Sequence, residues 1–225
     1  MYFFHWSILL LIPALIFTII AQIRVKSTFA KMSKVRSASG MTGRQVAEDL
    51  LRRNNIHDVQ VEQVSGNLTD HYDSKHKVLR LSEGVYNSSS LAAVGVAAHE
   101  TGHAIQHARA YAPLNIRHMI FPVANFGSRW GIWLFIIGMF ISQFQFLMDV
   151  GIAFFAGAVL FHIVTLPVEF NASRRALAQL SGSGYLREQE IGGARSVLNA
   201  AALTYVAAAA MAVLQLIRLL ILRDE

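Results

Sequence analysis

The stretch that decides the fold is residues 130–168, WGIWLFIIGMFISQFQFLMDVGIAFFAGAVLFHIVTLPV, in which Asp149 is the only charged residue. As a single helix these 39 residues would be about 58 Å long, whereas the hydrocarbon core of a bilayer is ~30 Å thick. The stretch therefore predicts two membrane-spanning helices, residues 130–148 and 150–168, with a tight turn near Asp149.

Two further regions, residues 6–23 and 200–222, are each about one bilayer long and largely uncharged. With 54% hydrophobic residues and a mean hydropathy of +0.41, the chain is too apolar for an ordinary soluble domain. These features predict a mostly α-helical integral membrane protein with four transmembrane helices, the first within residues 1–23 and the last at 200–222.

Basic residues give the expected orientation. The first span has no basic segment before it, unlike a signal peptide, and is followed by Arg24, Lys26, Lys31, Lys34 and Arg36. Positive charge marks the cytoplasmic side, so both termini should lie outside. Of the 20 Lys and Arg residues, all except Arg218 and Arg223 then lie inside. The net charge of +6 is explained by basic residues on the cytoplasmic side, which face anionic lipids. No nucleic-acid partner is therefore expected.

Residues 24–129 are predicted to form a cytoplasmic α+β domain. Phe29, Met32 and Val35 among basic residues suggest a short helix on the membrane surface. Thr42 and Gln45 form a capping box for a helix to about Asn54. Two short antiparallel strands are expected, the first from alternating Val59, Val61 and Val64 and the second at residues 77–81, with a polar turn-rich segment between them. Residues 87–90, NSSS, would start the next helix.

That next helix carries the pentad H-E-T-G-H, residues 99–103. Residues four apart share a helical face, so His99 and His103 can bind one cation, and Glu100 can act on a metal-activated water. The alternative is a helix with two incidental histidines. The chain contains no cysteine, so zinc ligands must come from His, Glu and Asp.

A catalytic zinc site needs a third protein ligand. His107 lies about 12 Å along the helix from His99, too far to share the ion, and is interpreted as packing or second-sphere. Gln106 and Arg109 stand where the metzincin pattern needs Gly and His, which excludes that class. Glu169 fits best, because two membrane crossings return it to the side of the pentad.

Alternatives to Glu169 stay open on the residues alone. Glu169 could instead pair with Arg174 or Arg175 at the interface, and the ligand could be Asp70, His71 or Asp73 in the loop between the strands. His162, an ionisable residue inside the third span, is a further functional suspect.

The chain resembles, essentially end to end, the YugP-like family of membrane neutral zinc metallopeptidases. Six blocks carry the resemblance: VKSTF (25–29), LTDHY (68–72), AAHETGHAIQ (97–106), NFGSR (125–129), LPVEFNASRR (166–175) and LNAAALTY (198–205). More distantly, it is similar to integral gluzincins of the HtpX and CAAX-protease type, in which a Glu-x-x-x-Asp helix joins the pentad helix.

The resemblance implies a multi-pass protein of the bacterial plasma membrane that binds one Zn²⁺ per chain. His99, His103 and Glu169 match its ligands and Glu100 its general base. The topology predicted above places Glu169 in a cytoplasmic helical segment at residues 169–199. Ser173 replaces the usual Asp, so Ser173, Asn171 or another acid must orient a zinc histidine. Candidates for stabilising the oxyanion are His71, Tyr72, Arg175, Asn199 and Tyr205.

The predicted function is therefore zinc-dependent endoproteolysis of membrane or unfolded proteins. A strand before the pentad helix, at residues 77–81, could align an extended substrate by edge addition. The alternative is a zinc-binding membrane scaffold or adaptor that cleaves nothing. Glu100 favours the enzyme, because a structural zinc site needs no base beside its ligand.

Overall fold

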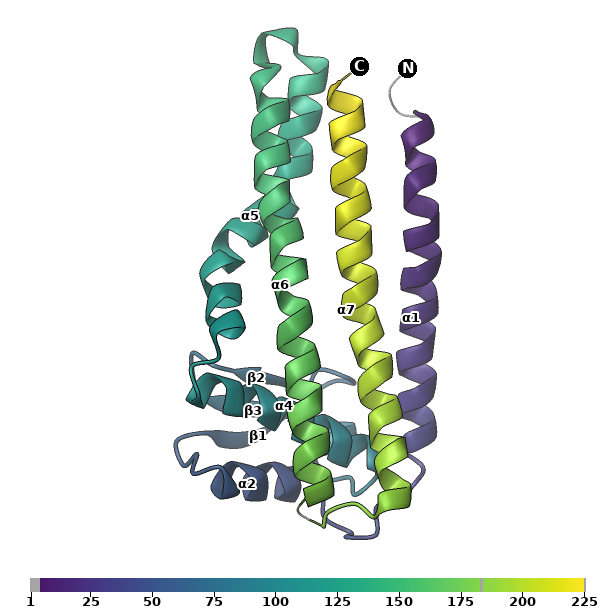
Figure 1. The fold of residues 1–225 in the computed structure, drawn as a ribbon, viewed down its shortest axis with the longest axis vertical. Helices are drawn as coiled ribbons and strands as arrows, with labels where there is room; N and C mark the ends of the chain where they lie inside the picture. The colour runs from purple at the N-terminus through teal and green to yellow at the C-terminus, as the bar shows by residue number, and fades with distance from the viewer. Residues whose placement is uncertain (1–4, 183, 225) are drawn as a thin grey trace. The chain divides into compact units, whose positions relative to one another are not determined.

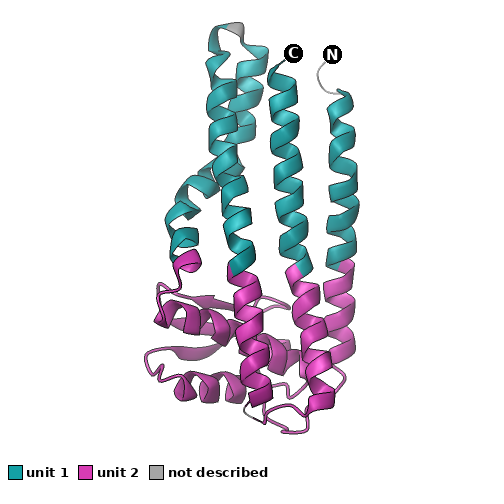
Figure 2. Ribbon diagram, in the orientation of Figure 1, with its two compact units in different colours: residues 1–22, 115–167, 203–225 teal, residues 23–114, 168–202 magenta. Residues whose placement is uncertain are grey.

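The computed structural model describes residues 5–182 and 184–224. It is mostly helical and contains four helical segments long and apolar enough to cross a membrane: Trp6–Met32, Ala112–Phe140, Phe146–Gly182 and Glu188–Arg223. The chain divides into two compact units, shown in different colours in Figure 2. Unit 1 comprises residues 1–22, 115–167 and 203–225, and unit 2 comprises residues 23–114 and 168–202.

The first helix is longer than predicted. A 3₁₀ turn at Trp6–Leu10 leads into α1, Leu11–Met32, which is continuous. The expected separate surface helix is therefore wrong, because no Gly or Pro interrupts the chain between Ile23 and Met32. Phe29 and Met32 instead pack against apolar clusters of unit 2.

The helical hairpin of unit 1 turns earlier than predicted. Helix α5, Ala112–Phe140, and helix α6, Phe146–Gly182, lie side by side in Figure 1 and are joined through a 3₁₀ turn at Ser142–Phe144. The expected turn near Asp149 is wrong. Asp149 lies in the first turn of α6, where a carboxylate is favourable, and it pairs with Arg223. Gly151 is not a break either, because it allows α6 to approach the backbone of α5 at Gly131.

The predicted boundaries at residues 129, 168 and 199 also differ from the observed helices. Helix α5 already begins at Ala112, α6 runs without a break through residue 169, and α7, Glu188–Arg223, is one helix across residue 200. Hydropathy predicts which residues can lie in the bilayer, but it does not predict where a helix ends. Helical turns made of polar residues continue the same backbone hydrogen bonds beyond the apolar stretch. Unit 1 is held by an apolar cluster that includes Phe135, Phe155 and Leu219.

In unit 2, two helices form the frame of the predicted domain. Helix α2, Gly43–Arg53, begins at the predicted capping box, in which both reciprocal hydrogen bonds between Thr42 and Gln45 are present. Helix α4, Leu91–Ala108, begins after Ser90, whose side chain accepts a hydrogen bond from the backbone N–H of Ala93. Both predicted helix starts are confirmed.

The sheet has three strands in the order β1-β3-β2, with β1 at Gln60–Val64, β2 at His71–Asp73 and β3 at Val78–Ser82. Strands β1 and β3 were expected from the sequence, but they pair in parallel, not antiparallel. The reason is β2, which lies between β1 and β3 in the sequence, within the segment predicted as a turn. Because β2 runs antiparallel to β3, the chain reverses direction from β1 to β2 and again from β2 to β3, so that β1 and β3 point the same way. Strand β3 is therefore central, and its edges are not available to a substrate.

A partly exposed acid, Asp49, ties α2 to the segment that precedes α7. Asp49 accepts hydrogen bonds from the hydroxyl of Tyr185 and from the guanidinium groups of Arg52 (2.6 Å) and Arg53 (2.8 Å). These contacts, above all the Tyr185 hydroxyl, lower the pKa of Asp49 from 3.8 to about 2. An acid whose pKa is lower in the folded state than in the unfolded state stabilises the folded state at pH values above the unfolded-state pKa. This contribution is lost as the pH falls through the folded-state pKa.

Asp49→Asn is therefore expected to destabilise the protein at pH 7 by roughly 2 kcal/mol, from the shift of the pKa. The difference from wild type should vanish as the pH falls from 3.8 to about 2. Thermal unfolding in detergent across this range measures it. Glu48→Gln, which breaks an exposed pair with Arg44, is the control and should change stability by less than ~1 kcal/mol. A pH-independent difference for Asp49→Asn would contradict the assignment.

Candidate metal centre

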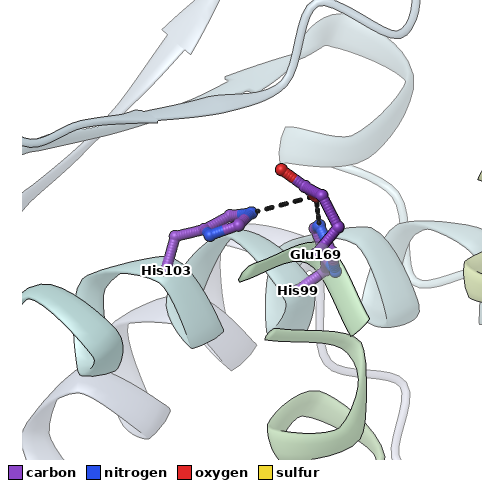
Figure 3. A group of neighbouring side chains, drawn as sticks. All are labelled: His99, His103 and Glu169. Atoms are coloured by element: carbon purple, nitrogen blue, oxygen red, sulfur yellow. Dashed lines mark hydrogen bonds and ion pairs between the residues drawn. The ribbon is translucent and has the colours of Figure 1, made fainter. Parts of the chain in front are cut away.

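Three side chains of unit 2 meet at one point, as Figure 3 shows. His99 and His103 lie on one face of α4, with ring centroids 4.8 Å apart, and Glu169 comes from α6. The Oε2 atom of Glu169 lies 3.2 Å from Nε2 of His99 and 3.4 Å from Nε2 of His103. Glu169 is 2% exposed, so the contact is well shielded from water.

The donor set suits zinc. Two imidazoles and one carboxylate are a common catalytic zinc set, and tetrahedral donors about 2.1 Å from the ion lie roughly 3.4 Å apart. The three ligand atoms here all lie within 4.8 Å of one another, so only small side-chain movements separate them from that geometry. These residues could therefore hold zinc, although their role as ligands stays a prediction.

Glu100 is the buried acid beside the cluster. It is 8% exposed, and its carboxylate accepts a hydrogen bond from the backbone N–H of Tyr72 in β2. Burial raises the pKa of Glu100 to about 7, an effect increased by the carboxylates of Glu169 and Asp70 and opposed by His99. A carboxylate with a pKa near 7 can take up and release a proton at neutral pH.

Gly102, inside the pentad, is what allows α6 to reach the histidines. A Cβ atom at this position would lie 2.8 Å from the carbonyl oxygen of Ala172 and 3.2 Å from its Cα. The backbones of α4 and α6 thus touch one turn after Glu169. This close approach brings Glu169, 66 positions after His103 in the chain, into contact with it.

Gly102→Ala is expected to weaken zinc binding at least tenfold although all three ligands remain, because the methyl group would push α6 away. Competition with a chromophoric chelator measures the affinity. Gly192→Ala in α7 is the matched control, since no atom lies within 4 Å of the added Cβ, and its affinity should be unchanged. Equal affinities for the two variants would show that the contact with Ala172 does not set the site.

Polar partners hold the far side of both imidazoles. The Oγ atom of Ser173 lies 3.1 Å from Nδ1 of His99. The amide of Gln106 lies 3.0 Å from Nδ1 of His103. The sequence reasoning missed this role of Gln106. The available signal was its spacing, because residue 106 is three positions after His103 and shares its helical face.

The other proposed ligands have different partners. Nδ1 of His107 is hydrogen bonded to the hydroxyl of Tyr72 at 2.9 Å, consistent with a packing or second-sphere role. Asp70 accepts hydrogen bonds from the backbone and side chain of Ser82, and Asp73 pairs with His76 and Arg80. Among the described residues, only His99, His103 and Glu169 form a group of possible metal ligands.

The candidates for an oxyanion donor lie on three elements: His71 and Tyr72 on β2, Arg175 on α6, and Asn199 and Tyr205 on α7. Arg175 donates to Asn171 at 2.7 Å, and Asn171 in turn contacts Gln106. His71 is exposed and hydrogen bonded to the carbonyl of Thr69, and Asn199 is exposed on α7. Tyr205 belongs to unit 1, as does His162, the suspect in the third span.

Comparison with known proteins shows the family of the chain. A family model described as "Putative neutral zinc metallopeptidase" matches residues 7–224. The "Putative membrane protease YugP" of Bacillus subtilis (strain 168) is 48% identical over 222 residues, which cover 97% of this chain and 98% of the relative. No solved structure gives a significant match. Because both similarities extend over nearly the whole length, the chain belongs to the neutral zinc metallopeptidase family that this model describes.

Proposed function

We propose that this protein is an integral membrane zinc metalloendopeptidase of a bacterial plasma membrane, which cleaves membrane proteins or unfolded chains. The observation that carries the proposal is the buried cluster of His99, His103 and Glu169 with the acid Glu100 beside it. Membership of the family, the membrane-protease relative and the four apolar helices all support it.

The chemistry is hydrolysis of a peptide bond. Zinc held by His99, His103 and Glu169 would supply Lewis acidity, acidifying a water and polarising the substrate carbonyl. Glu100 accepts the proton of the attacking water and delivers it to the leaving amine, as its raised pKa permits. The backbone N–H of Tyr72 orients the Glu100 carboxylate for both transfers.

Strand β2 is the edge of the sheet nearest this chemistry. It pairs with β3 on one side, and its central residue Tyr72 contacts Glu100 through the backbone and His107 through the hydroxyl. An extended substrate that aligns along β2 would pass close to Glu100, and β-strand addition recognises backbone without requiring a fixed sequence. This mode suits unfolded chains and extended segments of membrane proteins.

The site is proposed to face the cytoplasm, with both termini outside. Basic residues follow the first span, and all Lys and Arg except Arg218 and Arg223 lie in the segments assigned to the inside. Glu169 follows directly on an apolar stretch, so the site would lie within a helical turn or two of the membrane surface. Substrates would then be presented at the inner face of the membrane.

Thiol labelling tests this orientation, because the chain has no native cysteine. Cysteine at Asp224 should react with a membrane-impermeant maleimide on intact cells, whereas cysteine at Ser74, in the turn between β2 and β3, should react only after permeabilisation. Labelling of Ser74→Cys but not Asp224→Cys on intact cells would reverse the topology and place the substrates outside.

The activity itself is tested with purified protein in lipid, supplied with one equivalent of zinc. Cleavage of unfolded soluble proteins or membrane-protein fragments, lost with a chelator and restored by zinc, is the expected result. Zinc binding without cleavage across a broad panel of such substrates would instead assign the protein as a zinc-dependent membrane scaffold.

A further inference from the structure

We infer that Gln106 is a positioning residue that keeps the proton of His103 on Nδ1 and so leaves Nε2 free to bind a metal. The inference rests on the proposed zinc site and assigns a role to a residue outside the pentad. Gln106 is completely buried on α4, and its side chain contacts three groups, namely His103, the backbone carbonyl of Val168 and the side chain of Asn171.

The orientation of the Gln106 amide follows from its neighbours. Its Nε2 atom lies 2.8 Å from the carbonyl oxygen of Val168, which can only accept a hydrogen bond. It also lies 3.0 Å from the Asn171 side chain, whose facing atom must be the oxygen, because Nε of Arg175 donates to that atom at 2.7 Å. Two acceptors therefore require the NH₂ group of Gln106 at this end.

The other end of the amide is consequently its oxygen. Oε1 of Gln106 lies 3.0 Å from Nδ1 of His103 and can only accept, so Nδ1 must carry a proton. Nε2 of His103 points to Glu169 and is the nitrogen available to a metal. Ser173 does not impose the same constraint on His99, because a hydroxyl can either donate or accept.

The same amide also links the two helices that supply the ligands. Val168 directly precedes Glu169 on α6, and Gln106 lies one turn after His103 on α4. The hydrogen bond from Gln106 to Val168 therefore fixes the register of Glu169 against His103. One buried side chain thus sets both the protonation of one ligand and the position of another.

Two measurements on purified protein in lipid test the inference, neither of which depends on hydrolysis. The first is ¹⁵N NMR of histidine-labelled, metal-free protein at alkaline pH in the Glu169→Ala background, which removes the carboxylate that would compete for a proton on Nε2. His103 is assigned by the His103→Gln spectrum. With Gln106 present, His103 should show the Nδ1–H tautomer. Gln106→Met should lose it, because a thioether sulfur is only a weak acceptor.

The second measurement is zinc affinity by chelator competition. Gln106→Met should bind zinc about 10- to 100-fold more weakly, as is usual when a partner of a ligand is removed. Thr101→Val is the matched control, since Thr101 is equally buried on α4 but bonds only the carbonyl of Ala97, and its affinity and tautomer should be unchanged.

An Nε2–H tautomer at His103 in the Glu169→Ala background with Gln106 present would overturn the inference whether or not the protein binds zinc. Unchanged tautomer and affinity in Gln106→Met would overturn it while leaving the zinc site intact. If wild type does not bind zinc at all, the proposed function fails, and the tautomer in Gln106→Met still decides whether Gln106 positions His103.

Discussion

Glu100→Gln should lower the rate of hydrolysis by on the order of 10²–10⁴-fold while zinc binding stays unchanged. The amide has nearly the same shape as the carboxylate but cannot accept the proton of the attacking water. Glu100 is not one of the three clustered ligand groups, so its replacement leaves the metal donors in place. Single-turnover cleavage of a fluorogenic peptide, together with zinc content, measures both effects on one preparation.

Stability provides the control for this variant. Because burial raises the pKa of Glu100 from 4.5 to about 7, the metal-free folded state binds more protons than the unfolded chain between these values. Wild type therefore loses stability as the pH rises through this window, whereas Glu100→Gln does not. Above pH 7 the metal-free variant should have a Tm equal to or higher than that of wild type. Unchanged cleavage by a folded, zinc-loaded variant would exclude Glu100 as the base.

Glu169→Ala should remove a zinc ligand and lower zinc affinity by more than the 10- to 100-fold typical of losing a partner of a ligand. The loss removes one of three protein donors and the negative charge that contacts both imidazoles. Chelator competition measures the affinity, and hydrolysis should be lost in parallel, although added zinc should partly restore it if the fold persists.

Two variants of competing candidates accompany this measurement. His71→Gln and Asp70→Asn should bind zinc like wild type, because His71 is exposed and Asp70 is hydrogen bonded to Ser82. Full zinc affinity in Glu169→Ala, with loss in either of the other two variants, would move the third ligand from α6 to Asp70 or His71, at the start of β2.

The sequence predicted the parts of the fold that depend on local or periodic signals. Hydropathy identified four helices able to span a membrane, and the capping residues Thr42 and Ser90 placed the starts of α2 and α4. The pentad could be interpreted in the same way, because the spacing of His99 and His103 is a property of a single helix. Such features depend on residues close together in the chain.

Other predictions failed where long-range contacts decide. The hairpin turns at residues 141–145 and not near Asp149, because Asp149 pairs with Arg223 of α7 and Gly151 packs against α5. The direction of β1 relative to β3 depends on β2, whose sequence His-Tyr-Asp carries no apolar alternation. A strand that is stabilised mainly by pairing with a neighbouring strand has only a weak signal in its own sequence.

The residue types of the candidate metal site could thus be predicted from the sequence alone: two histidines at helical spacing, an acid between them and a glutamate after an apolar stretch. Their assembly was decided by tertiary structure. Gly102 has no side chain, so α6 can touch α4 at Ala172, and only this approach brings Glu169 to the histidines.

The hydrogen-bond partner of Nδ1 of His103 also depends on residues distant in the sequence. Val168, Asn171 and Arg175 together determine which end of the Gln106 amide faces this nitrogen. Hydrogen bonds between groups 62 and 65 positions apart leave no periodic signal in the chain, because they require close contact in space and not proximity in sequence.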